Sequence, residues 1–279
     1  MGRVLLQGWD LALLMMLGTL VGASLTDPLG GDWLAAAFWA ALAIVLLRRV
    51  GSVLLDNTHL LLARRGVQRD RAAPRYVRAL FEDYAETFER HLLFDLRYAA
   101  PNLVRAALDA DAVTLAGADV LDVGCGSGLC GPLLKPPASR LTGVDLSPAM
   151  LAKAAAKGCY DRLVEGDLVA VLRREEKRYD IVVAADVFVY CGDLRAIFAA
   201  VERVLKPGGI FVFTTEVVRG TDEALSWYLT KSGRYTHSWD YVMLGLKEAH
   251  LEAIQSEPAT LRLQHGAPVP GDVWLARRA

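Results

Sequence analysis

Beyond about residue 75, short apolar runs alternate with longer stretches in which apolar residues recur every three to four positions. Short apolar runs bounded by turn residues are typical of buried strands, whereas the longer pattern is typical of amphipathic helices. Their alternation predicts a mostly parallel sheet with helices on both faces, an α/β fold. We expect strands near 119–123, 141–145, 161–164, 180–185, 209–215, 259–264 and 272–276, and helices over 77–92, 97–110, 128–134, 147–157, 193–204 and 239–251.

Two nearly continuous apolar segments precede this region, at residues 11–25 and 33–47. Each is about 15 residues long, whereas a helix needs roughly 20 to cross a bilayer. The turn sequence between them carries no positive charge, while Arg3 precedes the pair and Arg48 and Arg49 follow it. Positive residues stay on the cytoplasmic side. We therefore expect residues 11–47 to form a membrane-associated helical hairpin in the inner (cytoplasmic) membrane, with the larger domain facing the cytoplasm.

Three other interpretations of these apolar segments stay open. The first segment could be a signal peptide cleaved after Ala23, although Asp10 beside the apolar stretch argues against cleavage. The pair could also pack on the soluble domain as a buried hairpin, or translation could start further downstream. On the hairpin interpretation the chain divides into an apolar helical segment at 1–66, a basic linker at 67–75 and a domain at 76–279.

The most informative run is VLDVGCGSG at residues 120–128, where a predicted strand leads directly into three alternating glycines. Glycines at such a point permit a tight strand-to-helix turn whose backbone can approach a ligand closely. Residues 141–145 form the next predicted strand and end on Asp145. A carboxylate at that position can accept hydrogen bonds from a ribose diol. The two features together predict a site for a nucleoside cofactor.

The glycines fit two cofactor templates. Residues 126–131, GSGLCG, match the dinucleotide pattern G-x-G-x-x-G. In that pattern the first glycine directly follows the strand, which here is Gly124, and the sixth position counted from it is Leu129. The dinucleotide interpretation therefore fails in register. A nicotinamide-dependent oxidoreductase is kept as an alternative function.

Five motifs follow one another along the chain: LDVGCGSG at 121–128, GVDLSPAM at 143–150, EGDL at 165–168, YDIVVAAD at 179–186 and LKPGGIFVF at 205–213. In this order they give the chain from about Pro74 onwards a resemblance to the class I S-adenosylmethionine-dependent methyltransferases. The resemblance implies a doubly wound, seven-stranded, mostly parallel sheet whose last strands pair antiparallel, and S-adenosyl-L-methionine as the cofactor.

Two further segments are similar to a narrower bacterial subgroup, the predicted methyltransferases described as TPR-repeat-associated. They are YAETFERHL at 84–92 and GRYTHS at 233–238. No helical repeat of about 34 residues is visible in the sequence, so the repeat part of that description does not transfer.

The resemblance implies roles for residues at the cofactor. The three glycines would let the backbone pass the methionine part, Asp145 would bind the ribose hydroxyls, and Asp167 would accept from the adenine amino group. Because Asp145 and Asp167 both precede predicted helices, capping of those helices is an alternative role for each. The expected cofactor-binding residues are Tyr84, Asp122, Gly124, Cys125, Gly126, Gly128, Asp145, Leu146, Met150, Gly166, Asp167, Leu168 and Asp186.

Catalysis by such a protein requires few catalytic side chains. A sulfonium methyl group is already activated, so direct in-line displacement needs a positioned nucleophile, and a general base is required only when the acceptor carries a proton. The candidate catalytic residues are Asp186, Tyr190, Glu216 and His237. Residues 185–190, ADVFVY, lack the Asn/Asp-Pro-Pro-Tyr/Phe signature of methylation at the amino groups of nucleobases and glutamine. The expected acceptor is therefore another small molecule, lipid-like or quinone-like if the hairpin places the domain at a membrane.

Composition excludes other partners. The four cysteines form no C-x-x-C pair and have no histidine at metal-ligand spacing, so we expect neither a disulfide nor a metal site. The net charge is −1, and residues after 75 hold 23 basic and 27 acidic side chains, which is unlike a nucleic-acid-binding surface. A non-catalytic, membrane-tethered cofactor-binding scaffold stays open as a third function.

Overall fold

The computed structural model describes residues 39, 42–43, 58–217 and 226–279. The chain divides into two compact units, Met1–Thr58 and His59–Ala279, and the fold described here is that of the second unit. The expected hairpin at 11–47 lies outside the described residues apart from 39, 42 and 43. Among the helices that are described, none is both long enough and apolar enough to cross a membrane.

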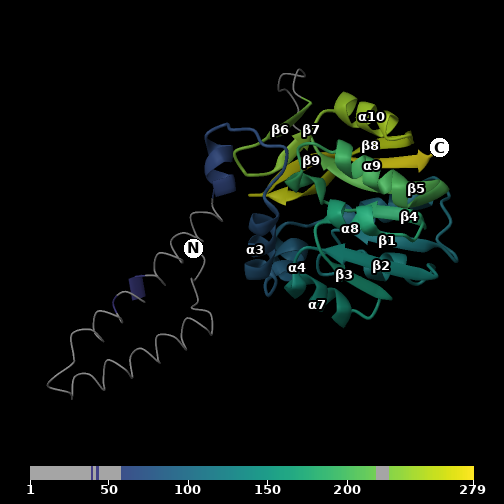
Figure 1. Ribbon diagram of the computed structural model, residues 1–279, viewed down its shortest axis with the longest axis horizontal. Coiled ribbons are helices and arrows are strands. Elements are labelled where there is room, and N and C mark those ends of the chain that lie inside the picture. The colour runs from purple at the N-terminus through teal and green to yellow at the C-terminus, as the bar shows by residue number, and fades with distance from the viewer. Residues whose placement is uncertain (1–38, 40–41, 44–57, 218–225) are drawn as a thin grey trace, which may run out of the picture. The chain divides into compact units, whose positions relative to one another are not determined.

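The second unit is built on a seven-stranded sheet in the order β3-β2-β1-β4-β5-β9-β8 (Figure 1). The order reverses between β1 and β4, and β9 is antiparallel to both of its neighbours. This confirms the predicted α/β sheet. The strands are β1 (Asp119–Val123), β2 (Arg140–Asp145), β3 (Arg162–Glu165), β4 (Tyr179–Ala184), β5 (Leu205–Glu216), β8 (Leu251–Gln264) and β9 (Ala267–Arg278).

The last two strands are longer than the sequence predicts. A two-residue turn joins them, with φ of 50° at His265 and 79° at Gly266. Two successive residues with positive φ are typical of the hairpin turn whose twist matches that of the flanking strands. Pairing therefore starts directly at Gln264 and Ala267 and continues to Leu251 and Arg278.

Alternating side chains of the central strands feed two separate cores. In β4, Ile181 and Val183 face one core, and Val182 and Ala184 face the other. This is the period of two expected of a strand buried on both faces. Helices α8 (Leu168–Arg174), α9 (Arg195–Val204) and α10 (Trp239–Glu248) cover the face of Val182, α5 (Ala100–Ala110) and α6 (Gly131–Leu134) cover the opposite face, and α7 (Pro148–Ala156) lies against β2 and β3.

The single helix expected over 77–92 is interrupted, so that prediction was wrong. Helix α3 (Pro74–Tyr84) ends in a turn closed by the Thr87 N–H donating to the Tyr84 carbonyl at 3.1 Å. The chain then continues as α4 (Phe88–Arg90) and a π-helical turn, η1 (His91–Asp95). The break re-aims the later side chains, so that Leu92 is buried whereas Phe94 is 77% exposed.

A short two-stranded hairpin was not predicted at all. Strand β6 (Trp227–Leu229) pairs with β7 (Tyr235–His237) in a separate sheet. Three-residue strands are too short to show a period, so the sequence gives no strand signal there.

Residues 59–76 pack against this hairpin. Ala63, Ala72 and Tyr76 form a small core with Leu229 and Tyr235. The His59 ring also bonds through Nε2 to the carbonyl of Gly233 at 2.8 Å. Part of the segment that the sequence presents as a basic linker is thereby held on the domain.

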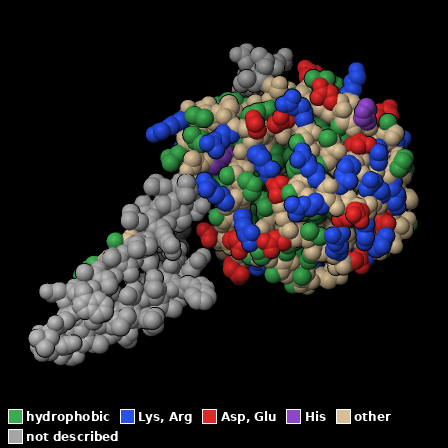
Figure 2. Space-filling view, viewed as in Figure 1, with side chains coloured by type: hydrophobic (Ala, Val, Ile, Leu, Met, Phe, Trp, Pro, Cys, Tyr) green, Lys and Arg blue, Asp and Glu red, His purple; other side chains and the backbone are tan. Residues whose placement is uncertain are grey.

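In the space-filling view, cationic and anionic side chains are interspersed over the visible face of the domain (Figure 2).

Candidate active site

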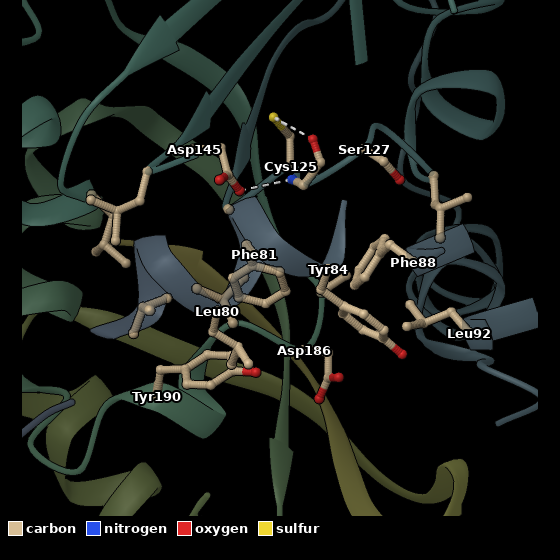
Figure 3. Close-up of a pocket in the computed structure, with 18 of the residues that line it drawn as sticks. Leu80, Phe81, Tyr84, Phe88, Leu92, Cys125, Ser127, Asp145, Asp186 and Tyr190 are labelled. Atoms are coloured by element: carbon tan, nitrogen blue, oxygen red, sulfur yellow. Dashed lines mark hydrogen bonds between the residues drawn. The ribbon is translucent and has the colours of Figure 1, made fainter. Parts of the chain in front are cut away.

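A pocket opens at the carboxyl ends of β1, β2 and β4, where the strand order reverses. In open α/β sheets, ligands bind in the crevice at that point. In the close-up, Asp145 and Cys125 lie on one side of the pocket, Asp186 and Tyr190 lie on the other, and Phe81 lies between them (Figure 3). The pocket therefore has a nucleoside-type end at the glycine turn and a second end beyond β4.

The turn after β1 presents its backbone to the pocket. The N–H of Gly126 donates to Oδ2 of Asp145 at 2.9 Å, and the N–H of Ser147 donates to Oδ1 at 2.9 Å. Burial raises the pKa of Asp145, although these backbone bonds favour the ionised form. A carboxylate offers about four lone-pair sites, so the oriented Asp145 side chain can still accept from a diol. A Cβ added at Gly126 would meet nothing within 4 Å, so the backbone there is open to a ligand.

The two acidic residues predicted for the nucleoside differ in their surroundings. Ser147, and not Asp145, caps α7, because its hydroxyl accepts from the N–H of Met150 at 3.2 Å. Asp167 does cap α8, with Oδ1 accepting from the N–H of Ala170 at 3.2 Å. The alternative role in helix capping thus applies to Asp167 alone of the two.

Arg71 pairs with the other oxygen of Asp167. Burial would raise the pKa of Asp167, but the Arg71 guanidinium outweighs it, and the pKa is lowered. Arg71 itself lines the pocket, together with Leu146, Gly166 and Leu168 from the predicted set.

Four of the predicted cofactor residues do not line the pocket, namely Asp122, Gly128, Met150 and Asp167. Asp122 is buried, accepts from the hydroxyl of Tyr160 at 2.7 Å, and has a pKa raised to about 7 by burial. A Cβ at Gly128 would lie 2.9 Å from Cε2 of Tyr160 and 3.1 Å from Cα of Ala154. Met150 is fully buried.

Aromatic side chains from α3 and α4 form one wall of the pocket. Phe81 packs edge-to-face on Phe88 and on Tyr190, with ring centroids 5.7 and 5.6 Å apart, and Tyr84 packs on Phe88 at 5.4 Å. Phe81, Tyr84, Phe88 and Leu92 all line the pocket. Aromatic faces attract cations, so this wall suits a sulfonium centre.

Two arginines and two carboxylates meet at the end of the pocket beyond β4. The guanidinium of Arg234 lies 3.0 Å from both oxygens of Asp186 and 2.6 Å from Oε1 of Glu216. Arg262 contacts the same two carboxylates, at 3.3 Å for Oδ1 of Asp186 and 2.5 Å for Oε1 of Glu216. Asp186 has a φ of 57°, and its N–H donates to Oγ1 of Thr214 at 2.8 Å. We call these four side chains the charged cluster.

The four candidate catalytic residues divide into two pairs. Asp186 and Tyr190 line the pocket, and burial raises the pKa of Tyr190. Glu216 lies behind the two arginines, and His237 lies outside the pocket and is 2% exposed. Nε2 of His237 is 2.9 Å from the carbonyl of Cys191 and must donate, while burial lowers the pKa of His237 to about 4.

Sequence reasoning missed Arg71, Arg234 and Arg262. They come from the expected linker, from the turn of the unpredicted β6–β7 hairpin, and from the edge strand β8. One signal was available, since Arg234 lies within the GRYTHS segment that resembles the bacterial subgroup. In the described part of the chain, no group of His, Cys, Asp or Glu is arranged to hold a metal ion.

Part of the chain is similar to known proteins. Residues 121–213 match the family model described as a methyltransferase domain. The chain is 30% identical over 142 residues to malonyl-[acyl-carrier protein] O-methyltransferase of Salmonella typhimurium, covering 50% of this chain and 53% of that protein. It is 29% identical over 117 residues to a ubiquinone biosynthesis O-methyltransferase of Coxiella burnetii, covering 41% and 50%. The chain thus spans about half the length of these curated relatives.

Solved structures agree on the fold. A 1,6-didemethyltoxoflavin-N1-methyltransferase of Burkholderia thailandensis, with S-adenosylhomocysteine bound, superposes with a TM-score of 0.58 at 22% identity, covering 77% of this chain and 94% of that one. The N-methyltransferase NodS of Bradyrhizobium japonicum gives a TM-score of 0.56 at 19% identity, covering 72% and 97%. The fold is that of a class I S-adenosylmethionine-dependent methyltransferase, and residues 121–213 are the part of the chain that matches the methyltransferase family model. The narrower resemblance to the TPR-associated subgroup stays a prediction.

Proposed function

We propose that this chain is an S-adenosylmethionine-dependent methyltransferase that acts on a small-molecule acceptor by direct in-line displacement. The observation that carries the proposal is the Asp145 carboxylate, which two backbone amides orient at the carboxyl end of β2 beside the exposed backbone of Gly126. The relatives named above, which are methyltransferases of small or carrier-bound acceptors by their descriptions, support the same conclusion.

The residues of the pocket fit this cofactor. Asp145 can hold the ribose, the glycine turn leaves room for the methionine part, and Leu146 and Leu168 line the pocket where the adenine would lie. Bound S-adenosylmethionine supplies an activated methyl group. The chain's part is to hold the acceptor in line and to keep water away, which the aromatic wall of Phe81 and Phe88 supports.

The finer acceptor class and the location of the protein are also proposals. The apolar segments at 11–47 support attachment to the inner membrane with the catalytic domain facing the cytoplasm, and a lipid-like or quinone-like acceptor would then be close at hand. Turnover should rise when vesicles of bacterial phospholipid that contain such acceptors are added to the full-length protein. Equal turnover by full-length protein and a form lacking residues 1–58, with no gain from vesicles, would contradict membrane attachment.

The proposed activity is tested by transfer of a tritiated methyl group from S-adenosylmethionine to bacterial small-molecule extract. Full-length protein should label a product, and Asp145→Ala should abolish the labelling at cofactor concentrations that saturate the unmodified protein. Binding of the cofactor without transfer to any extract would favour the scaffold, and binding of NADH in its place would favour the oxidoreductase.

A further inference from the structure

We propose that the methyl acceptor carries an anionic oxygen group that is ionised at neutral pH, a carboxylate, and that Arg234 and Arg262 bind this group at the end of the pocket beyond β4. The proposal rests on the proposed methyltransferase function and specifies the acceptor. It assigns to the two arginines the selection of an oxyanion and the rejection of a cationic amine.

The charged cluster presents its arginines to the pocket. Arg234, Arg262 and Asp186 line the pocket, whereas Glu216 lies behind them. The pocket therefore faces two guanidiniums and one carboxylate at this end, although the four side chains together are neutral. A guanidinium has five N–H donors, and NH1 of Arg234 contacts, among the described residues, the hydroxyl of Tyr190 alone, at 3.5 Å. Donor capacity thus remains on Arg234, which lines the pocket.

The charged cluster is also costly to keep buried in the fold. The side chains of Arg262 and Glu216 are 5% and 7% exposed, and taking such charges out of water is expensive even when they are paired. Asp186 moreover holds a left-handed backbone conformation, which concentrates at functional sites in non-glycine residues. Four elements (the ends of β4 and β5, the β6–β7 turn and β8) converge to build it. A role in ligand binding explains the free-energy cost of burying these charges better than a role in stability does.

The ion pairs of the charged cluster also limit which acceptors could lose a proton in the pocket. An amine acceptor would arrive protonated and would need a base, but both guanidiniums hold Asp186 and Glu216, and His237 lies outside the pocket. The same guanidiniums would repel an ammonium group. An oxyanion needs no base: its oxygen forms the new O–C bond as the S–C bond breaks. Its negative charge and the sulfonium charge disappear together, leaving a methyl ester and a thioether.

The apolar surroundings of the pocket favour this reaction. Phe81, Phe88 and Leu92 give the pocket an apolar wall, and attraction between opposite charges is strong where water is excluded. When opposite charges cancel in a reaction, the transition state carries less charge than the bound reactants, so an apolar environment favours the transition state relative to them. Arginine also binds carboxylates through two parallel bonds, which would fix the orientation of the acceptor.

The test separates acceptors by charge. A bacterial small-molecule extract is divided by ion exchange into acidic, neutral and basic fractions, and each is incubated with full-length protein and tritiated-methyl S-adenosylmethionine. Label should enter products of the acidic fraction. Transfer to the basic or neutral fraction would overturn the proposal while leaving methyl transfer intact. Transfer to no fraction would contradict the methyltransferase function, and this proposal with it.

Variants then assign the role to the arginine. Arg234→Gln should raise the apparent KM for the acidic fraction by about tenfold or more and leave the Kd of S-adenosylmethionine unchanged. Arg234→Lys keeps the charge and loses the planar fork, so it should give a smaller rise and serves if the glutamine variant does not fold. Arg178→Gln removes an exposed arginine before β4, at the opposite end of the sheet, and should match the unmodified protein. A loss of cofactor affinity with unchanged KM would instead place the carboxylate of the cofactor on Arg234 and refute the proposal.

Discussion

We expect the buried histidine at the end of β7, His237, to make the protein less stable as the pH falls. His237 is neutral in the folded protein because burial lowers its pKa to about 4, and its Nε2–H already donates to backbone carbonyls. Nδ1 is buried without a hydrogen-bond partner among the described residues, so a second proton would have no acceptor. In the unfolded chain the ring takes up a proton below its ordinary pKa of 6.5. The unfolded state therefore binds more protons between pH 4 and 6.5, and His237 lowers stability as the pH falls through that interval.

The magnitude follows from the width of the interval. At about 1.4 kcal/mol per pH unit, the separation of the two pKa values corresponds to about 3 kcal/mol lost between pH 6.5 and pH 4. His237→Gln retains an N–H donor for the carbonyl of Cys191 and removes the titrating group. We expect the variant to be less stable than the unmodified protein at pH 7.5, through imperfect packing, and to lose less stability on acidification.

Urea unfolding of the full-length proteins at several pH values between 7.5 and 4.5 checks this prediction. The difference in unfolding free energy between variant and unmodified protein should shift towards the variant by about 2 kcal/mol over that range. Parallel pH profiles for the two proteins would refute the neutral, buried state of His237.

Other predictions concern the turn after β1 and its surroundings. Asp122 has the opposite sign to His237: its pKa of about 7 exceeds the ordinary 3.8, so it adds stability as the pH falls from 7 towards 4, and Asp122→Asn should flatten this part of the urea-unfolding profile. Gly128→Ala should lower the thermal unfolding midpoint, because φ is 83° and Cβ would press on Tyr160 and on the backbone of Ala154, whereas Gly126→Ala should fold and bind S-adenosylmethionine more weakly in calorimetry. Arg71→Gln should raise the pKa of Asp167, seen by carboxyl NMR titration, and the stability that this pair provides at neutral pH and loses in acid should be absent from the variant.

Local signals made much of the fold predictable. The strands at 119–123 and 141–145 follow from apolar runs that end in glycine or aspartate, and these runs also locate the nucleoside end of the pocket. Asp145 was found because a carboxylate at the end of the second strand has one place to point in this fold.

The rest of the site depends on contacts between residues distant in sequence. Arg234 and Arg262 are brought to Asp186 by a hairpin with three-residue strands and by the edge strand β8, and neither element marks its arginine as a pocket residue. His237 was a reasonable candidate in a loop rich in hydroxyls, but β7 turns its ring towards the carbonyls after η2 (Phe188–Tyr190), away from the pocket. The break in the helix after Tyr84 likewise has no proline or glycine to announce it.

We infer that the turn after β1 and Asp145 together form a site for S-adenosylmethionine. The most direct measurement is calorimetric titration of the full-length protein with S-adenosylmethionine and, separately, with NADH, alongside Asp145→Ala. We expect micromolar binding of S-adenosylmethionine, loss of that binding in the variant, and no heat from NADH. If the folded protein does not bind S-adenosylmethionine, or binds NADH in a way that depends on Asp145, the site is not one for S-adenosylmethionine.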